Sequence, residues 1–202
     1  MCARVLTITS LALTVTTAGI AAPAFPTAHV AAVLPAARTV QVRTVQGIRV
    51  RPLDAPGRAA TVLIFIACDC PLSNSYAPEI QRLRADYALS PIAFYVVYVG
   101  GGTPQEVQAH AKAHGYEAFA LRDAAHRLVN LTKATVTPEA AVVGPQGRLL
   151  YEGRIDDRFP DFGKARDIAD VHDLRRALDA IRAGRPVAVP RTKAVGCYIP
   201  GT

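Results

Sequence analysis

Two cysteines separated by one residue are the side chains best suited to chemistry. Cys68 and Cys70 lie in "CDCPLS", directly after the apolar run "TVLIFIA". A thiolate can attack a disulfide or a peroxide, and two neighbouring thiolates suit a soft ion such as Cu(I). A cysteine can equally be a small buried residue at the end of a strand. The pattern leaves a redox centre, a metal site and a structural turn open.

Cys70 stands where the apolar run ends and Pro71 can begin a helix. Free N–H groups and the positive end of a helix dipole favour a thiolate at that point, so the pKa of Cys70 should be lowered. Ser73, three residues on, cannot resolve a mixed disulfide, but its hydroxyl can hydrogen-bond the Cys70 sulfur. The spacing predicts Cys70 as a nucleophile.

Two-thiol chemistry at Cys70 requires a partner, which is either Cys68 or Cys197. A Cys68–Cys70 bridge would close a strained small ring and would be easily reduced. Cys197 follows a glycine in the C-terminal tail, 185–202, which could fold back over the site. We favour Cys197 as the resolving thiol; its alternative role is a static disulfide that holds the tail.

Composition and the N-terminus place the chain outside the cell interior. The 202 residues are enough for one domain. The net charge of +7 comes from Lys and Arg residues that are scattered along the chain, and this distribution does not indicate nucleic-acid binding. Residues 1–24 are apolar with small residues at candidate cleavage sites, which predicts a signal peptide; an uncleaved membrane anchor is the alternative. Residues 25–38 read as an Ala/Pro-rich linker. We expect an exported protein, periplasmic or extracellular, in a compartment that permits disulfides.

The remaining chain alternates strands and helices. A hairpin is expected over 39–53, buried strands over 61–67 and 92–100, and a strand–turn–strand unit over 139–155. Helices are expected over 78–89, 103–115, 123–133 and 173–184, with Asp123 and Asp173 as N-caps. A charged loop, 157–172, is inserted before the last helix. This order predicts an α/β domain, 39–184, with a mixed central sheet and helices on both faces.

The sequence resembles the thioredoxin superfamily, above all exported proteins of the TlpA/ResA type and redoxins of the AhpC/TSA-like branch. The resemblance rests on "VTPEAAVVGPQGRLLYEGRI" and on a motif register that includes Phe65, Ala67, Cys70, Pro71, Pro78 and Glu79. It implies a thioredoxin-like fold in which Pro138 is a cis-proline and the Thr137 backbone pairs with an extended substrate. The chain departs from the family because Ser73 replaces the second cysteine of C-x-x-C, leaving a CxCPxS site.

The resemblance and the cysteines together predict an exported thiol–disulfide oxidoreductase that needs no cofactor. Its partners would be a disulfide-containing protein or small thiol substrate and an exported or membrane-bound thiol reductant. The alternative is a Sco-like copper protein holding Cu(I) with Cys68, Cys70 and His126. The third hypothesis is a peroxiredoxin-like peroxidase; Ala67 stands where that family has a hydroxyl, which counts against it.

Overall fold

The computed structural model describes residues 32–34 and 36–202. The predicted signal peptide or membrane anchor, 1–24, and the first part of the predicted linker lie outside the described residues. Within the described part, no helix is both long and apolar enough to cross a membrane.

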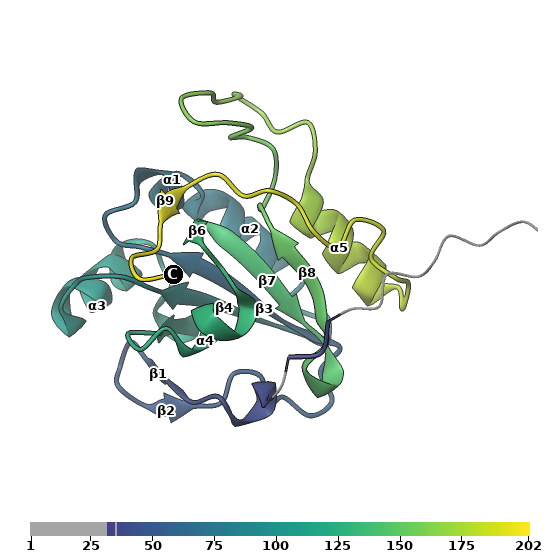
Figure 1. Cartoon of the computed structure of the whole chain (residues 1–202), viewed down its shortest axis with the longest axis horizontal. Coiled ribbons are helices and arrows are strands. Elements are labelled where there is room, and N and C mark those ends of the chain that lie inside the picture. The colour runs from purple at the N-terminus through teal and green to yellow at the C-terminus, as the bar shows by residue number, and fades with distance from the viewer. Residues whose placement is uncertain (1–31, 35) are drawn as a thin grey trace, which may run out of the picture. The chain divides into compact units, whose positions relative to one another are not determined.

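A seven-stranded sheet forms the centre of the fold, with the strand order β2-β1-β5-β4-β3-β7-β8 (Figure 1). Strand β3 runs parallel to β4, and β4 parallel to β5, whereas β7 and β8 add antiparallel strands on the other side of β3. The hairpin of β1 and β2 joins the sheet through an antiparallel contact with β5. The strands are β1 Val42–Thr44, β2 Arg49–Val50, β3 Ala60–Ile66, β4 Ile92–Tyr98, β5 Ala120–Arg122, β7 Glu139–Val143 and β8 Leu149–Gly153.

In the described part of the chain, five helices pack around this sheet, so the predicted mixed α/β architecture is confirmed. They are α1 Pro71–Ser75, α2 Ala77–Asp86, α3 Pro104–Ala113, α4 Arg127–Thr132 and α5 Asp173–Arg182. One hydrophobic cluster includes residues of α2, α3 and α5, and a second includes residues of α4. Short 3-10 turns occur at Ala37–Thr39, Glu117–Phe119 and Pro145–Gly147.

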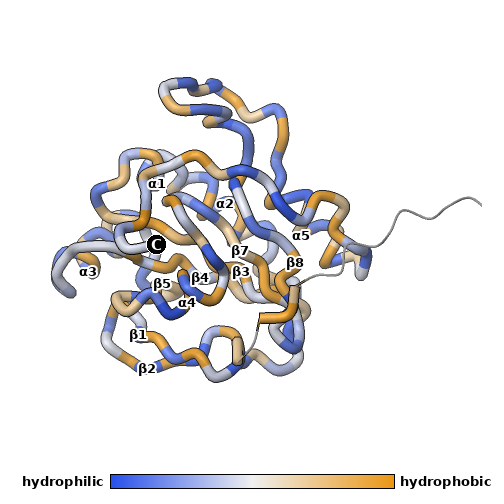
Figure 2. Tube along the Cα trace, in the orientation of Figure 1, coloured by the Kyte–Doolittle hydropathy of each residue, from blue (hydrophilic) through white to orange (hydrophobic). Residues whose placement is uncertain are grey.

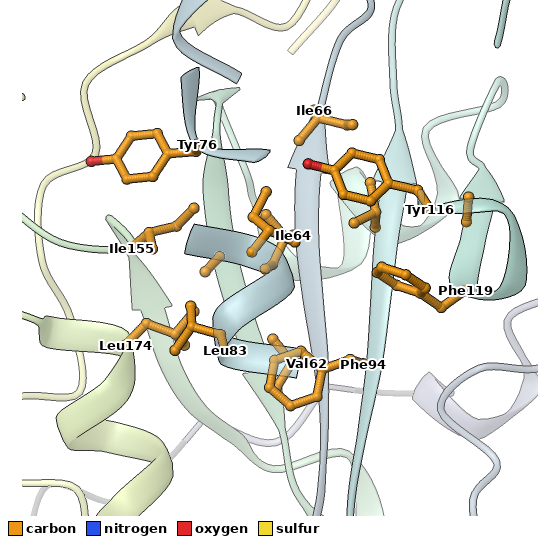
Figure 3. Packing of buried hydrophobic residues seen from close by; sticks show 14 of the residues in the cluster. Val62, Ile64, Ile66, Tyr76, Leu83, Phe94, Tyr116, Phe119, Ile155 and Leu174 are labelled. Atoms are coloured by element: carbon orange, nitrogen blue, oxygen red, sulfur yellow. The ribbon is translucent and has the colours of Figure 1, made fainter. Parts of the chain in front are cut away.

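Strand β3 divides its side chains between the two clusters, because successive residues of a strand point to opposite faces. Val62, Ile64 and Ile66 enter the first cluster, which also contains Leu83 of α2 and Leu174 of α5 (Figure 3). Their neighbours on the same strand, including Leu63 and Phe65, enter the second cluster. Every residue of β3 is buried, so the strand that leads to the cysteines is fixed from both sides.

Three predicted helix boundaries are wrong in detail. The helix expected over 78–89 ends at Asp86, and a separate one-turn helix, α1, precedes it. Helix α4 begins at Arg127, because the Asp123 carboxylate accepts N–H groups of its first turn from outside the helix. Asp173 is the first residue of α5 and not its N-cap; its carboxylate accepts a hydrogen bond from Arg154 Nε at 2.6 Å.

Two segments outside the regular sheet reach toward the end of the domain that carries the cysteines. The excursion 157–172 projects above the fold in Figure 1, and much of it is hydrophilic in Figure 2. The C-terminal tail runs back across the molecule and ends in β9, Cys197–Tyr198, which pairs with β6, Val136–Thr137, in a separate two-stranded sheet. Figure 1 shows β9 close to α1.

Candidate functional site

Cys70 lies at the junction of β3 and α1 and is almost completely buried, with 1% of its surface exposed. It is the N-cap of α1, and its sulfur accepts the Ser73 N–H at 3.5 Å. The protonated thiol donates to the Thr137 carbonyl oxygen at 3.1 Å. The peptide bond between Thr137 and Pro138 is cis. The structure therefore brings Cys70, Ser73, Thr137 and Pro138 together at one point.

The surroundings of Cys70 favour its ionised form. Burial alone would raise the pKa of this thiol, but the nearby side chains of Cys197, Ser73 and Thr137 and the hydrogen bond from the Ser73 N–H outweigh burial, so the pKa is lowered. The Ser73 hydroxyl is buried and has no hydrogen-bond partner within the described residues. It is therefore available to donate to the sulfur once Cys70 loses its proton.

Cys197 is the other thiol at this site, although 126 residues separate it from Cys70 in the 202-residue chain (197 − 71 = 126). The antiparallel pairing of β6 and β9 places Cys197 opposite Thr137, whose carbonyl oxygen accepts the Cys70 thiol, and the neighbouring Cys197 side chain helps to lower the pKa of Cys70. Burial and this contact with Cys70 raise the pKa of Cys197 to about 11. The two thiols thus form an asymmetric pair in which Cys70 ionises first.

The close approach of β9 to β6 depends on Gly196, the glycine that precedes Cys197 in the tail. A Cβ atom at this position would overlap the Thr137 carbonyl group. The backbone of Ile199, two residues beyond Cys197, donates its N–H to the Thr135 carbonyl at 3.0 Å. Only a residue without a side chain can bring the tail this near to the cis-proline loop.

Cys68 has different neighbours from Cys70, although only Asp69 separates them. It is partly buried, and burial followed by the negative charges of Asp69 and Glu106 raises its pKa. Arg122 opposes this effect without reversing it. None of the three cysteines in the described part of the chain forms a disulfide. Cys197 thus lies on the strand that borders the Cys70 site, whereas Cys68 lies in a separate environment that favours its protonated form.

A polar network behind Cys68 was missed by the sequence analysis. The Asn74 side chain donates to the Cys68 carbonyl at 3.2 Å, and its amide oxygen lies 2.9 Å from His110 Nε2. The other ring nitrogen of His110 lies 2.8 Å from the Tyr98 hydroxyl. Since the amide oxygen only accepts, Nε2 carries the proton and Tyr98 donates to Nδ1. The available signal was the i, i+4 spacing of His110 and His114 on a predicted helix.

The structure does not bring together the ligands that the copper hypothesis requires. Across residues 32–34 and 36–202, no group of three or more His, Cys, Asp or Glu side chains could hold a metal ion. The nominated set of Cys68, Cys70 and His126 is therefore not brought together. His126 forms the N-cap position of α4 in a left-handed conformation instead. The residues do not fit a three-ligand copper site.

The charged residues after β8 hold the excursion and do not act on Cys70. Asp157 accepts the N–H groups of Asp170 and Val171, both at 2.8 Å, which closes the base of the loop. Arg158 reaches the Ser75 carbonyl at the end of α1, at 3.1 Å. The groups that do most to lower the pKa of Cys70 are Cys197, Ser73 and Thr137, and no arginine of the described residues is among them. The donors at Cys70 are thus neutral groups.

Three solved structures show what this fold is similar to. A hypothetical protein from Sinorhizobium meliloti 1021 is 26% identical with a TM-score of 0.70, covering 81% of this chain and 91% of that one. An uncharacterised conserved protein from Geobacillus kaustophilus is 28% identical with a TM-score of 0.69, covering 80% and 89%. The exposed lipoprotein thioredoxin Etrx1 from Streptococcus pneumoniae strain TIGR4 is 15% identical with a TM-score of 0.52, covering 69% and 98%.

These matches confirm the predicted thioredoxin-like fold. No protein-family model matches the sequence, and no curated protein matches it either.

Proposed function

We propose that the protein is a thiol–disulfide oxidoreductase in which Cys70 is the nucleophile and Cys197 is its partner thiol. The observation that carries the proposal is the position of Cys197 on β9 opposite Thr137, whose carbonyl oxygen accepts the Cys70 thiol at 3.1 Å. The pKa of Cys70 is lowered and that of Cys197 is raised. A thiolate next to a protonated thiol can form a disulfide by exchange with an external disulfide, and an external thiol can break it again. The likeness of the fold to a thioredoxin supports the same chemistry.

The roles of the surrounding residues follow from their contacts. Ser73 supplies a hydroxyl and an N–H to the Cys70 sulfur, which favours the thiolate. Thr137 contributes its side chain to the same stabilisation, and its backbone pairs with β9. The substrate would be a disulfide or dithiol of a protein or small molecule. An external thiol would return the pair to its starting state after a disulfide substrate, and an external disulfide would do so after a dithiol substrate. No cofactor is needed for this cycle.

Export is part of the proposal, and it rests on the composition of residues 1–24. A Cys70–Cys197 disulfide would persist only in an oxidising compartment. Intact-mass measurement of the protein recovered from outside the cytoplasm would show whether the first 24 residues have been removed.

The proposal is tested by a disulfide map of the full chain. The protein is alkylated before and after mild reductant, and its cysteine peptides are assigned by mass spectrometry. We expect a Cys70–Cys197 bridge that opens under mild reductant and that still forms in the Cys68→Ser variant. A bridge between Cys68 and Cys70 would reassign the partner. Free Cys70 and Cys197 after treatment with an oxidant would contradict the proposal.

A further inference from the structure

The two sulfurs of the proposed disulfide are not equally accessible. Cys70 has 1% of its surface exposed, and Ser73, Thr137 and Cys197 surround its sulfur. Cys197 is only partly buried, and its neighbour Tyr198 is 78% exposed. An external thiolate approaching the pair from solvent therefore meets Cys197 before it can reach Cys70.

The tail also occupies the edge along which an extended partner would pair. Strand β9 takes the antiparallel position beside β6, and Gly196 packs directly against the Thr137 carbonyl. Strand addition by a substrate peptide needs a free row of N–H and C=O groups on that edge. Val136 and Thr137 are already paired with β9 of the same chain.

Several contacts hold the tail in this position. Glu152 N–H donates to the Pro190 carbonyl at 2.9 Å, and Thr192 N–H donates to the Glu152 carbonyl at 3.0 Å. The Tyr151 hydroxyl lies 2.7 Å from the Thr192 hydroxyl. Beyond these contacts, the side chains of Val195 and Ile199 are buried at 8% and 3% exposure. The tail is thus attached before and after Cys197, so the exchange reaction has to occur with β9 in place.

We propose that the external thiol exchanges with Cys197 and not with Cys70, so that the mixed disulfide forms on the tail. Because β6 is occupied, the partner is a small or flexible thiol that reaches Cys197 without adding a strand. This inference rests on the proposed function, and it assigns the exposed cysteine of the pair as the point of entry.

The chemistry of exchange agrees with this assignment. The incoming thiolate attacks the Cys197 sulfur, the Cys70–Cys197 bond breaks, and Cys70 leaves as a thiolate with the bonding electron pair. A second thiolate, from the same partner or another, then attacks the partner's sulfur in the mixed disulfide. The partner leaves as a disulfide and Cys197 as a thiolate, which takes up a proton. The partner is oxidised by two electrons and the protein is reduced. A thiol of lowered pKa is the better leaving group, and Cys70 is that thiol.

The experiment identifies the cysteine with which an external thiol first forms a mixed disulfide. The full chain is oxidised, the Cys70–Cys197 bridge is verified by mass spectrometry, and reduced glutathione is added as a single-thiol probe. Samples are trapped with N-ethylmaleimide at increasing times, and the cysteine peptides are mapped. We expect glutathione on Cys197 and maleimide on Cys70 at the earliest times, with about tenfold less of the reverse pattern.

A second probe tests the partner class. A seven-residue peptide of β-forming residues with one central cysteine is compared with glutathione. We expect the peptide to gain no rate advantage per thiolate and to attach to Cys197 as well. Glutathione trapped first on Cys70, or a peptide that reacts about tenfold faster and attaches to Cys70, would overturn the inference. Failure of the protein to form the bridge at the outset would instead refute the proposed function, so the two failures are distinct.

Discussion

Cys68 and Cys70 are separated by one residue, yet they lie in opposite chemical environments. Burial acts against ionisation at both thiols. Around Cys70, three neighbouring polar side chains and the hydrogen bond from one backbone N–H overcome that effect and lower the pKa. Around Cys68, Asp69 and Glu106 add negative charge, and the pKa rises. Neutral donors directed at a sulfur therefore decide which cysteine becomes a thiolate, and burial alone does not.

The two cysteines also differ in which parts of the chain surround them. The neighbours of Cys68 come from β4, α3 and β5, which belong to the regular fold. The environment of Cys70 adds β6 and the tail strand β9. The tail thus completes a site that the central domain begins. The predictions below test this difference, from the largest expected effect to the smallest.

Removing the close contact of the tail should have the largest effect. In Gly196→Val, the new side chain cannot fit against the Thr137 carbonyl, so β9 should separate from β6. We expect loss of the Cys70–Cys197 bridge and a decrease of about 2–4 kcal/mol in the free energy of unfolding. Peptide mapping after oxidation and denaturant titration measure the two effects.

Gly101→Val is the matched control, because a Cβ at Gly101 meets no atom within 4 Å. The bridge should form in this variant as in the wild type. If Gly196→Val also forms the bridge at the wild-type rate, the tail does not depend on the close backbone approach.

The Cys197 thiol should affect the pKa of Cys70 and leave the pKa of Cys68 unchanged. In Cys197→Ala, the side chain that does most to lower the pKa of Cys70 is lost, so this pKa should rise. Cys197→Ser retains a hydroxyl donor and should restore part of the lowering. Ultraviolet absorbance of the thiolate, recorded in a Cys68→Ser background, follows Cys70. An equal pKa in the alanine and serine variants would show that the donor is not responsible.

The fold was more predictable than the site, for a physical reason. Strand β3 and helix α3 carry local signals, namely a continuous apolar run and helix-forming residues over 103–115, and the structure has a strand and a helix in these ranges. The Cys70 motif could be recognised for the same reason, because its residues are adjacent in sequence.

The pairing of Thr137 with Cys197, and the need for glycine at 196, depend on where the tail folds. No local pattern in "TKAVGCYIP" specifies an antiparallel partner 60 residues away (197 − 137 = 60). The hydrogen bonds among Asn74, His110 and Tyr98 are likewise contacts between separate elements. Composition could only suggest that such contacts exist.

Removal of the Ser73 hydroxyl should have a smaller effect on the difference in ionisation between Cys70 and Cys68. Ser73→Ala deletes a buried hydroxyl that donates to the Cys70 thiolate. We expect the rate of Cys70 alkylation at neutral pH to fall about fivefold, which corresponds to about 1 kcal/mol for one hydrogen bond. Ser75→Ala is the control, since the Ser75 hydroxyl bonds only the Leu72 carbonyl. Similar rates in the two variants would exclude a specific role for Ser73.

The smallest effect concerns the network behind Cys68. Burial and the neighbouring His114 lower the pKa of His110. As pH falls below about 6.5, the unfolded chain takes up a proton that folded His110 resists, so the free energy of unfolding should decline. The decline continues until the pH reaches the lowered pKa of the folded state, where His110 becomes protonated and loses its acceptor contact with Tyr98.

Denaturant titration over this pH range should show a shallower decline in His110→Gln than in the wild type. His126→Gln is the comparison, because His126 lies outside this network. An identical pH dependence in wild type and His110→Gln would mean that the network does not couple to protonation. In every case the Cys70–Cys197 bridge should form at the wild-type rate, because the contacts of His110 lead to Cys68 and not to Cys70.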